Sequence, residues 1–358
     1  MKIYSIKKHI CRAVIVVSLE AKKLISIPMP KEYLDALVHA GYRIIGKYGA
    51  YEPCHYFKMA LKERIMCYKY WFFGTRTHRC IQWSPIVECN QACLFCWRVH
   101  RMDLGLPPFK IADPEAIDWD EPEILIEQVI EEYYKTLRSF DPRYNPKIDK
   151  EMWEDAMRGP DHLATSLIGE PLMYPRIDDI IYLGKKRGMT TFIVTNGTMP
   201  RTLEQMHTLP HQIYVSVVGP NYKVWSMITR PLWNAREQWE NLLKTLELLP
   251  SLNMRKVFRI TAVKNYNLVY PEEYARLIEI AEPDFVEVKG YSWVGRSRER
   301  LPRDSQPTIE DVREFAYMLS ELTGYEVVDE VPRARVVLLW NRVTPLELRP
   351  RNISNARK

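Results

Sequence analysis

Six of the seven cysteines fall within 43 consecutive positions, and this clustering restricts the fold more than any other feature of the chain. They are Cys54, Cys67, Cys80, Cys89, Cys93 and Cys96. An odd total with this uneven spacing is not typical of a secreted, disulfide-bonded framework. The cluster of thiols therefore indicates metal chemistry. The seventh, Cys11, is expected to be a small buried apolar residue.

Cys89, Cys93 and Cys96 have the spacing C-x3-C-x2-C. Three thiolates so close in sequence can fold around one soft metal centre. A structural zinc site takes four ligands, and here the fourth would have to come from a distant part of the chain. Three cysteines on three irons of a cubane cluster leave the fourth iron open to a small molecule. The spacing favours an iron–sulfur cluster, with a zinc knuckle as the alternative.

The composition is that of a globular protein. The chain has 358 residues, 46% of them apolar and 27% charged, which excludes disorder, collagen and coiled coil for the whole chain. The longest apolar stretch, Ala13–Leu19, is too short to span a bilayer, and no signal-peptide cleavage pattern follows it. We expect a soluble protein of the cytoplasm with no membrane partner.

Positive charge is concentrated at both ends of the chain. Residues 1–80 carry 15 Lys/Arg against 5 Asp/Glu, residues 332–358 carry 7 against 1, and the middle carries 29 against 39. Such clustering suits a polyanionic partner, although a solvated face would look the same.

Rings and cations also alternate between Cys67 and Cys80, where exposed rings could stack on bases and cations could bind phosphates. The alternative is a buried core strand. The residues are Trp71, Phe72, Phe73, Arg76, His78 and Arg79. Two further basic stretches are Arg296, Arg298, Arg300 and Arg303, and the segment from Arg333 to Lys358.

Strand and helix patterns alternate from residue 121 onward, which predicts parallel βαβ units in an α/β protein. Strands are expected at His162–Ile168, Thr191–Thr195, Gln212–Val218, Arg255–Val263, Phe285–Val288, Tyr325–Val331 and Val336–Trp340. Helices are expected at Glu121–Phe140, Arg176–Arg187, Asn234–Leu249, Glu272–Ala281 and Ile309–Leu322.

The strand-like segment Cys80–Glu88, followed by C-x3-C-x-aromatic-C, resembles the radical S-adenosylmethionine (SAM) superfamily. The resemblance implies a partial (β/α)6 TIM-like barrel. It also implies that the open iron chelates the methionine part of SAM, and that an electron from the cluster cleaves SAM to a 5′-deoxyadenosyl radical. A parallel barrel places its chemistry at the carboxyl ends of its strands, where the cysteines and the motifs below fall.

Three later segments extend the resemblance. Ser166-Leu-Ile-Gly-Glu-Pro171 is similar to the glycine–glutamate turn after the second barrel strand, while Thr195-Asn-Gly197 ends the third strand and Tyr214-Val-Ser216 the fourth. The resemblance implies that SAM is bound by Ser166, Gly169, Glu170, Asn196 and Ser216. Ordinary loop and turn-capping roles are the alternative for these residues.

Cys54, Cys67 and Cys80 lie 13 residues apart, twice over. This upstream triplet before the radical motif is similar to the tRNA 4-demethylwyosine (wyosine-base) synthase family, over roughly residues 50–330. The resemblance implies a second [4Fe–4S] cluster on this triplet and a Schiff base between pyruvate and Lys69. An amine is nucleophilic only when neutral, and aromatic neighbours such as Tyr68 and Tyr70 could lower its pKa by desolvation. A surface lysine on a hydrophobic strand is the alternative.

The implied enzyme is a lyase of wybutosine biosynthesis. It would condense N1-methylguanosine, at position 37 of tRNA-Phe, with carbons 2 and 3 of pyruvate to form the tricyclic 4-demethylwyosine. Its cofactors would be two [4Fe–4S] clusters and SAM. Its partners would be the tRNA-Phe anticodon loop, pyruvate and a separate flavodoxin- or ferredoxin-type electron donor. Since no phosphate-binding loop is evident in the first eighty residues, we expect the archaeal type without a flavodoxin domain, acting as a monomer.

We expect three regions: an N-terminal extension (1–79) with the upstream cysteines and Lys69, the radical SAM partial barrel (80–290), and a basic C-terminal extension (291–358) that contacts tRNA. Two other functions stay open. One is a different radical SAM enzyme with an auxiliary cluster, such as an activase or a cofactor-biosynthesis enzyme. The other is a non-catalytic zinc or RNA-binding module.

Overall fold

The structure, a computed structural model, describes residues 29–110 and 116–346. Cys11, Ala13–Leu19 and residues 347–358 of the basic C-terminal segment lie outside the described residues. No helix in the two described ranges is long and apolar enough to cross a membrane.

Six parallel strands form the centre of one sheet and pair in sequence order. They are β3 (Cys80–Ser84), β4 (His162–Thr165), β5 (Thr190–Thr195), β6 (Gln212–Ser216), β7 (Arg255–Ala262) and β8 (Phe285–Gly290). The helices between them are α4 (Pro122–Ser139), α5 (Lys150–Met157), α6 (Ile177–Lys186), α7 (Pro200–Glu204), α8 (Tyr222–Thr229), α9 (Ala235–Leu248) and α10 (Pro271–Ala281). This order of parallel strands and crossover helices confirms the predicted α/β class.

Antiparallel strands extend the sheet at both edges. The amino-terminal part contributes α1 (Lys31–His39), β1 (Arg43–Ile45), β2 (Gly49–Tyr51), α2 (His55–Glu63) and α3 (Tyr68–Phe73). The carboxyl-terminal part contributes α11 (Ile309–Thr323), β9 (Glu326–Val331) and β10 (Val336–Trp340). The ten-stranded sheet runs in the order β1-β2-β3-β4-β5-β6-β7-β8-β10-β9 and does not close on itself. The barrel is therefore partial, as predicted.

Apolar side chains on the outer face of the sheet pack against the amphipathic helices. In α4, Pro122 occupies the first turn, where its missing N–H costs nothing, and Leu125, Val129 and Leu137 are buried at helical spacing. In α11, a capping box of Thr308 and Asp311 begins the helix, and Gly324 ends it in the left-handed region. These local signals explain why the predicted helices lie within a residue or two of the observed ones.

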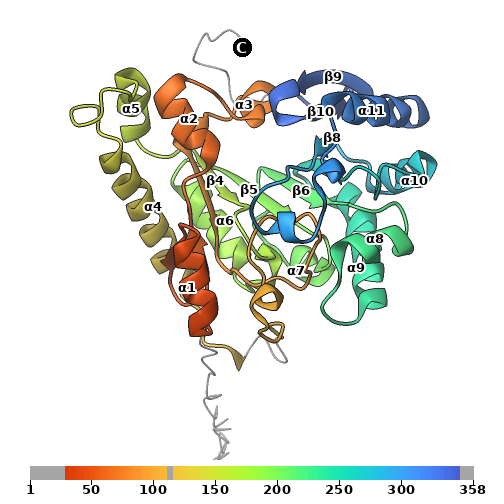
Figure 1. The fold of residues 1–358 in the computed structure, drawn as a ribbon, viewed down its shortest axis with the longest axis horizontal. Helices are drawn as coiled ribbons and strands as arrows, with labels where there is room; N and C mark the ends of the chain where they lie inside the picture. The colour runs from red at the N-terminus through yellow and green to blue at the C-terminus, as the bar shows by residue number, and fades with distance from the viewer. Residues whose placement is uncertain (1–28, 111–115, 347–358) are drawn as a thin grey trace, which may run out of the picture.

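The inner face of the sheet encloses a second apolar cluster that α3 covers at one end. Ala164, Phe192, Tyr214, Val257 and Phe285 come from successive strands, and Tyr68, Phe72 and Phe73 come from the helix. Figure 1 shows α2 and α3, in orange, with α3 lying between α2 and the strands β9 and β10, and α3 contacts β9. The N-terminal extension thus supplies part of the barrel's interior packing.

The proposed nucleic-acid role of the aromatic segment after Cys67 is wrong. Residues 68–73 form a helix that ends at Gly74, whose φ is +69°, so they are neither a strand nor an exposed surface. Phe72 and Phe73 are buried, and Phe73 packs edge-on against Phe285 with ring centroids 5.2 Å apart. The rings of Phe72 and Phe73 therefore have no free face for a base, whereas Trp71 is half-buried.

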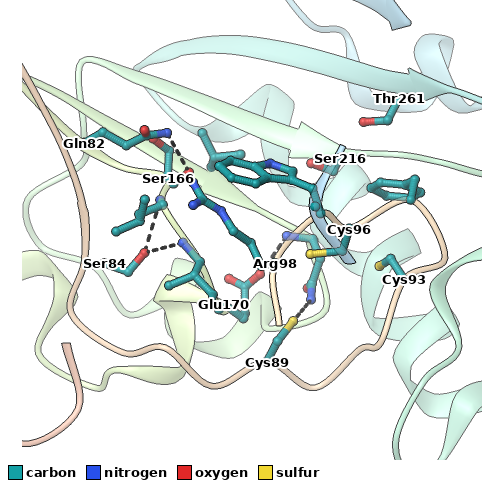
Figure 2. A pocket seen from close by; sticks show the side chains of 18 of the residues that line it. Gln82, Ser84, Cys89, Cys93, Cys96, Arg98, Ser166, Glu170, Ser216 and Thr261 are labelled. Atoms are coloured by element: carbon teal, nitrogen blue, oxygen red, sulfur yellow. Dashed lines mark hydrogen bonds between the residues drawn. The ribbon is translucent and has the colours of Figure 1, made fainter. Parts of the chain in front are cut away.

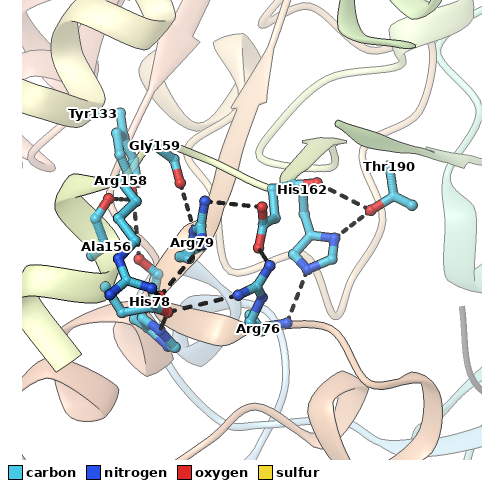
Figure 3. A network of polar contacts seen from close by, with 11 residues as sticks. Arg76, His78, Arg79, Tyr133, Ala156, Arg158, Gly159, His162 and Thr190 are labelled. Carbon is cyan, nitrogen blue, oxygen red and sulfur yellow. Dashed lines mark hydrogen bonds and ion pairs between the residues drawn. The ribbon is translucent and has the colours of Figure 1, made fainter. Parts of the chain in front are cut away.

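The cations that follow are buried too. Figure 3 shows them in a polar network at the amino ends of β3, β4 and β5. Arg79 contacts Asp161 at 3.0 Å, Arg76 pairs with the same carboxylate, and His78 lies 2.7 Å from Asp155. The backbone N–H of Arg76 donates to His162 Nε2 at 2.9 Å. The network fixes the segment between Cys67 and Cys80 against the sheet.

Candidate active site

A cavity of about 980 Å3 opens at the carboxyl ends of the parallel strands, where parallel barrels place their chemistry. All twelve residues predicted from the sequence line it, including both cysteine triplets and Lys69. Figure 2 shows Cys89, Cys93 and Cys96 around one part of this cavity, with Glu170 and Ser216 nearby. Residues from positions 54 to 216 are therefore gathered around one space.

The loop that carries Cys89, Cys93 and Cys96 is held by backbone and amide contacts. The N–H of Leu94 donates to the carbonyl of Ile228 at 2.9 Å, at the end of α8. Asn196 Nδ2 donates to Asn90 Oδ1 at 2.7 Å and lies 3.9 Å from Cys89 Sγ. Asn196 thus anchors the cysteine loop to the end of β5. The sequence predicted only that Asn196 would bind SAM, and did not predict this structural role.

Arg300 clamps the same loop from the carboxyl-terminal part of the chain. Its guanidinium donates to the carbonyls of Cys96 and Leu94 and pairs with Asp103 at 2.8 Å. The side chain is only 8% exposed, so Arg300 is not available to phosphates, and its assignment to a basic surface stretch is wrong. The sequence around Arg300 contains no signal that this arginine binds backbone carbonyls of a distant loop.

The thiols of the cysteine loop differ in acidity. Burial raises the pKa of Cys93, and for Cys89 burial and the nearby Glu170 carboxylate do the same. Burial also opposes ionisation of Cys96, but His100 and the N–H of Arg98 outweigh it and lower its pKa to about 7. His100 lines the cavity beside this loop.

The donor set of this loop fits an iron–sulfur cluster. Three thiols face one cavity, all free of disulfides, and sulfur is the donor that such clusters take. In residues 29–110 and 116–346, no three His, Cys, Asp or Glu side chains converge as they would around a single ion. A cubane cluster does not need that convergence, because each thiolate binds a different iron. Cys89, Cys93 and Cys96 would hold it.

Gly169 and Glu170 form the turn after β4. Gly169 has φ of +76°, and a Cβ there would lie 2.4 Å from the carbonyl oxygen of Ile86, so no other residue fits. Gly169 therefore packs closely against the backbone just before Cys89, and it also lines the cavity. Glu170 accepts from Thr195 Oγ1 and the N–H of Asn196, both at 2.7 Å. Burial raises its pKa to about 7 despite these bonds.

The other two predicted SAM-binding residues stand at strand ends. Ser166 follows β4 and donates its N–H to the carbonyl of Trp83 at 3.0 Å, and Ser216 ends β6. Both line the cavity together with Thr261 on β7. Short polar side chains at adjacent strand ends can donate to the carboxylate and hydroxyl groups of a ligand such as SAM.

The second triplet is built from three element boundaries. Cys54 precedes α2 as its N-cap residue, Cys67 precedes α3 in the same way, and Cys80 begins β3. The N–H of Cys67 donates to Thr77 Oγ1 at 3.0 Å. Burial raises the pKa of Cys67 to about 11 and that of Cys80 to about 12, and Lys69 opposes the rise at both.

Lys69 stands in the first turn of α3 with its amine in the cavity. Its Nζ lies 4.5 Å from the ring centroid of Tyr214 and 5.5 Å from that of Phe192. Burial and then the nearby Arg259 lower the pKa of this lysine. The aromatic rings that face the amine come from β5 and β6, rather than from the chain neighbours Tyr68 and Tyr70 that the sequence suggested.

Charged residues on the inner faces of β7 and β8 complete this part of the cavity. Arg259 pairs with the buried Glu287 at 2.8 Å, and Lys289 lines the cavity beyond them. Burial lowers the pKa of Lys289 to about 8. The sequence contained a signal for Glu287 and Lys289, which are two positions apart in an otherwise apolar strand. Side chains at every second position of a strand lie on the same face of the sheet.

A partly closed parallel α/β sheet, with three cysteines on the loop after its first parallel strand and a glycine–glutamate turn after its second, defines a radical SAM protein. Comparison with known families agrees. Residues 83–278 match the radical SAM superfamily, and residues 280–341 match the family described as wyosine base formation.

The most similar relatives carry one name. The SAM-dependent tRNA 4-demethylwyosine synthase of Pyrococcus horikoshii is 41% identical over 87% of this chain and 89% of its own length, and that of Methanocaldococcus jannaschii is 32% identical over 87% and 97%. The human relative, TYW1, is 32% identical over 86% of this chain but only 41% of its own length. The chain therefore belongs to the tRNA 4-demethylwyosine synthase family of radical SAM enzymes, whose radical SAM chemistry implies SAM and one [4Fe–4S] cluster.

Solved structures extend the similarity to three dimensions. A structure of TYW1 with a lysine–pyruvate adduct bound has a TM-score of 0.77 and 29% identity, covering 89% of this chain and 98% of that one. A crystal structure of archaeal TYW1 has a TM-score of 0.71 and 27% identity, covering 89% and 100%.

Proposed function

We propose that this enzyme condenses N1-methylguanosine, at position 37 of tRNA-Phe, with carbons 2 and 3 of pyruvate to form 4-demethylwyosine. The observation that carries this proposal is that two cysteine triplets and Lys69 line one cavity. The shared name of the relatives supports the product. The lysine–pyruvate adduct in a solved relative supports the second substrate.

In this proposal, Cys89, Cys93 and Cys96 hold the cluster that SAM needs, and Ser166, Gly169, Glu170, Asn196 and Ser216 bind SAM. When bound, the cluster and SAM supply a 5′-deoxyadenosyl radical that takes a hydrogen atom from the N1-methyl group of the base. The chain's own contribution is to hold these groups in one enclosed space that excludes water.

Cys54, Cys67 and Cys80 hold a second [4Fe–4S] cluster close to the pyruvate. Lys69 attacks the keto carbon of pyruvate with its neutral amine, and water leaves as the imine forms. Its position against Tyr214 and Phe192, with Arg259 nearby, favours the neutral amine. The carbon radical of the base would add to carbon 2, the imine carbon of the bound pyruvate. The bond from carbon 2 to the carboxylate would then break, which restores the imine and releases carbon 1 as the carbon dioxide radical anion, and one of the two clusters would take up its odd electron as carbon dioxide leaves. The exocyclic amine of the base would finally displace the Lys69 amine by transimination.

The remaining parts of the proposal concern partners and organisation. The three regions 1–79, 80–290 and 291–358 divide the work as expected, a separate flavodoxin- or ferredoxin-type protein supplies electrons, and the enzyme acts as a monomer in the cytoplasm. Of the expected tRNA contacts, Arg298 and Arg303 remain candidates, while Arg300 is buried against Asp103. Binding that involves several phosphates weakens steeply as salt rises, and binding independent of salt would contradict this surface.

The decisive experiment is anaerobic incubation of the reconstituted enzyme with N1-methylguanosine-containing tRNA, pyruvate and SAM, followed by nucleoside mass spectrometry. The expected product is 4-demethylwyosine, formed only when all three substrates are present. SAM cleavage without tricyclic product in the complete mixture would instead favour another radical SAM enzyme with an auxiliary cluster.

Elemental analysis distinguishes the third function. Two cubane clusters correspond to about eight irons per chain. Zinc without iron after anaerobic purification would indicate a non-catalytic zinc or RNA-binding module.

A further inference from the structure

The arginines that line the cavity are all neutralised. Arg98 pairs with Glu52 at 2.6 Å, Arg101 with Glu88 at 2.6 Å, and Arg259 with Glu287 at 2.8 Å. The lysines on the cavity wall differ, because none has a carboxylate partner within the described ranges: Lys58, Lys69 and Lys289. These lysines are therefore the cations of the cavity wall that lack an ion-pair partner among the described residues.

Of these lysines, Lys289 is linked to Lys69 by a chain of contacts between neighbouring side chains. Its Nζ lies 5.4 Å from the ring centroid of Tyr68, the residue next to Lys69. The hydroxyl of Tyr68 accepts from Arg259 at 2.8 Å. The guanidinium of Arg259 in turn lies 4.1 Å from the ring centroid of Tyr214, which also contacts the amine of Lys69. Two tyrosines and one neutralised arginine thus join the two lysines.

The ammonium of Lys289 has bonding capacity left. An ammonium has three donors, and only one contact to oxygen, a long one of 3.4 Å to the carbonyl of Ala334, is present among the described residues. Lys289 lines the same cavity as the second triplet and Lys69, with donors to offer a ligand.

We propose that Lys289 binds the carboxylate of the α-keto acid whose keto carbon reacts with Lys69. This inference rests on the proposed function and adds a subsite to it. A keto acid bonded to Lys69 has its carboxylate one carbon from the imine. Lys289, which is joined to Lys69 through Tyr68, Arg259 and Tyr214 and lines the same cavity, offers that carboxylate a charged partner. Lys69 itself cannot serve, because its nitrogen is neutral when it attacks. The subsite selects α-keto acids over uncharged ketones and aldehydes of the same size.

The test measures imine formation by reductive trapping in the reconstituted holoenzyme. Pyruvate and its uncharged methyl ester are titrated with cyanoborohydride, and adducts on Lys69 are counted by mass spectrometry. In Lys289→Met, half-maximal trapping should need about tenfold or more pyruvate, the loss expected for one charge-assisted hydrogen bond, while trapping of the ester changes little. Lys289→Arg should restore part of the pyruvate preference. Lys244→Met, an exposed lysine on α9, is the matched control.

Binding of lactate, which has the carboxylate but no keto group, separates the two claims. If the wild type traps pyruvate and Lys289→Met traps it with the same dependence, the subsite is wrong and the proposed function stands. A changed iron content or cluster potential with an unchanged pyruvate dependence also overturns the subsite, because Lys289 would then only balance cluster charge. If the wild type forms no adduct yet binds lactate through Lys289, the subsite holds and the Schiff base on Lys69 fails.

Discussion

The two cysteine triplets reach the same cavity by different structural routes. Cys89, Cys93 and Cys96 share one short loop, which α8, Asn196 and Arg300 hold in place. Cys54, Cys67 and Cys80 stand instead at the starts of α2, α3 and β3. The first site depends on a local motif with clamps. The second depends on how three separate elements pack, so the two should fail for different reasons.

The largest expected effects come from replacing one cysteine of either triplet, because the two triplets should control different activities. Cys89→Ala should abolish SAM cleavage and lower iron from about eight to about four per chain, because one cluster loses a ligand and the other does not. Cys67→Ala should lower iron equally but leave SAM cleavage intact. Iron analysis and deoxyadenosine release check both. Loss of SAM cleavage in Cys67→Ala would mean that the two sites are not independent.

Next, Lys69→Ala separates the chemistry from both metal sites. The variant should keep its iron and its SAM cleavage but form no tricyclic product, because the amine that we propose binds pyruvate is gone. Nucleoside mass spectrometry measures the product, and Lys244→Ala on the exposed face of α9 is the control. Full product formation by Lys69→Ala would remove the Schiff-base proposal.

A third change tests whether packing alone maintains the second triplet. Asp161→Asn leaves Arg76 and Arg79 without their shared buried carboxylate, which should cost about 3 kcal/mol of stability. The melting temperature should fall, and iron should be lost from the second site before the first. Asp118→Asn, which breaks only the exposed pair with Lys47, should cost less than about 1 kcal/mol. Equal loss of iron from both sites would contradict this reasoning.

The smallest expected difference concerns the iron-free protein. Cys96, with a pKa lowered to about 7 by His100 and the N–H of Arg98 against the effect of burial, should be alkylated first at pH 7.5. Cys67 and Cys80, with pKa values raised by burial to about 11 and about 12, should react far more slowly. The Cys96 rate should rise with pH through about 7, and His100→Gln should move that midpoint upward. Peptide mass spectrometry after iodoacetamide treatment measures each rate.

The sequence predicted most of what local signals encode. The strands and the capped helices α4 and α11 follow from periodicity and capping signals. The placement of Cys89, Cys93 and Cys96 and of the short polar residues after strand ends follows from motif spacing. What it missed depends on long-range contacts. The burial of Arg76 and Arg79 requires carboxylates more than seventy positions away, and the role of Arg300 requires a loop about two hundred positions earlier. The helix at 68–73 was missed because an aromatic run has strand character that tertiary packing overrode.

The Arg300 clamp has a consequence for the order in which the enzyme matures. A chain is made from its amino end, and early segments fold first. The cysteine loop therefore leaves the ribosome while the guanidinium that binds its carbonyls, 204 positions after Cys96, is still unmade. The loop therefore reaches its final conformation only in the complete polypeptide. We expect stable insertion of iron at Cys89, Cys93 and Cys96 to follow translation.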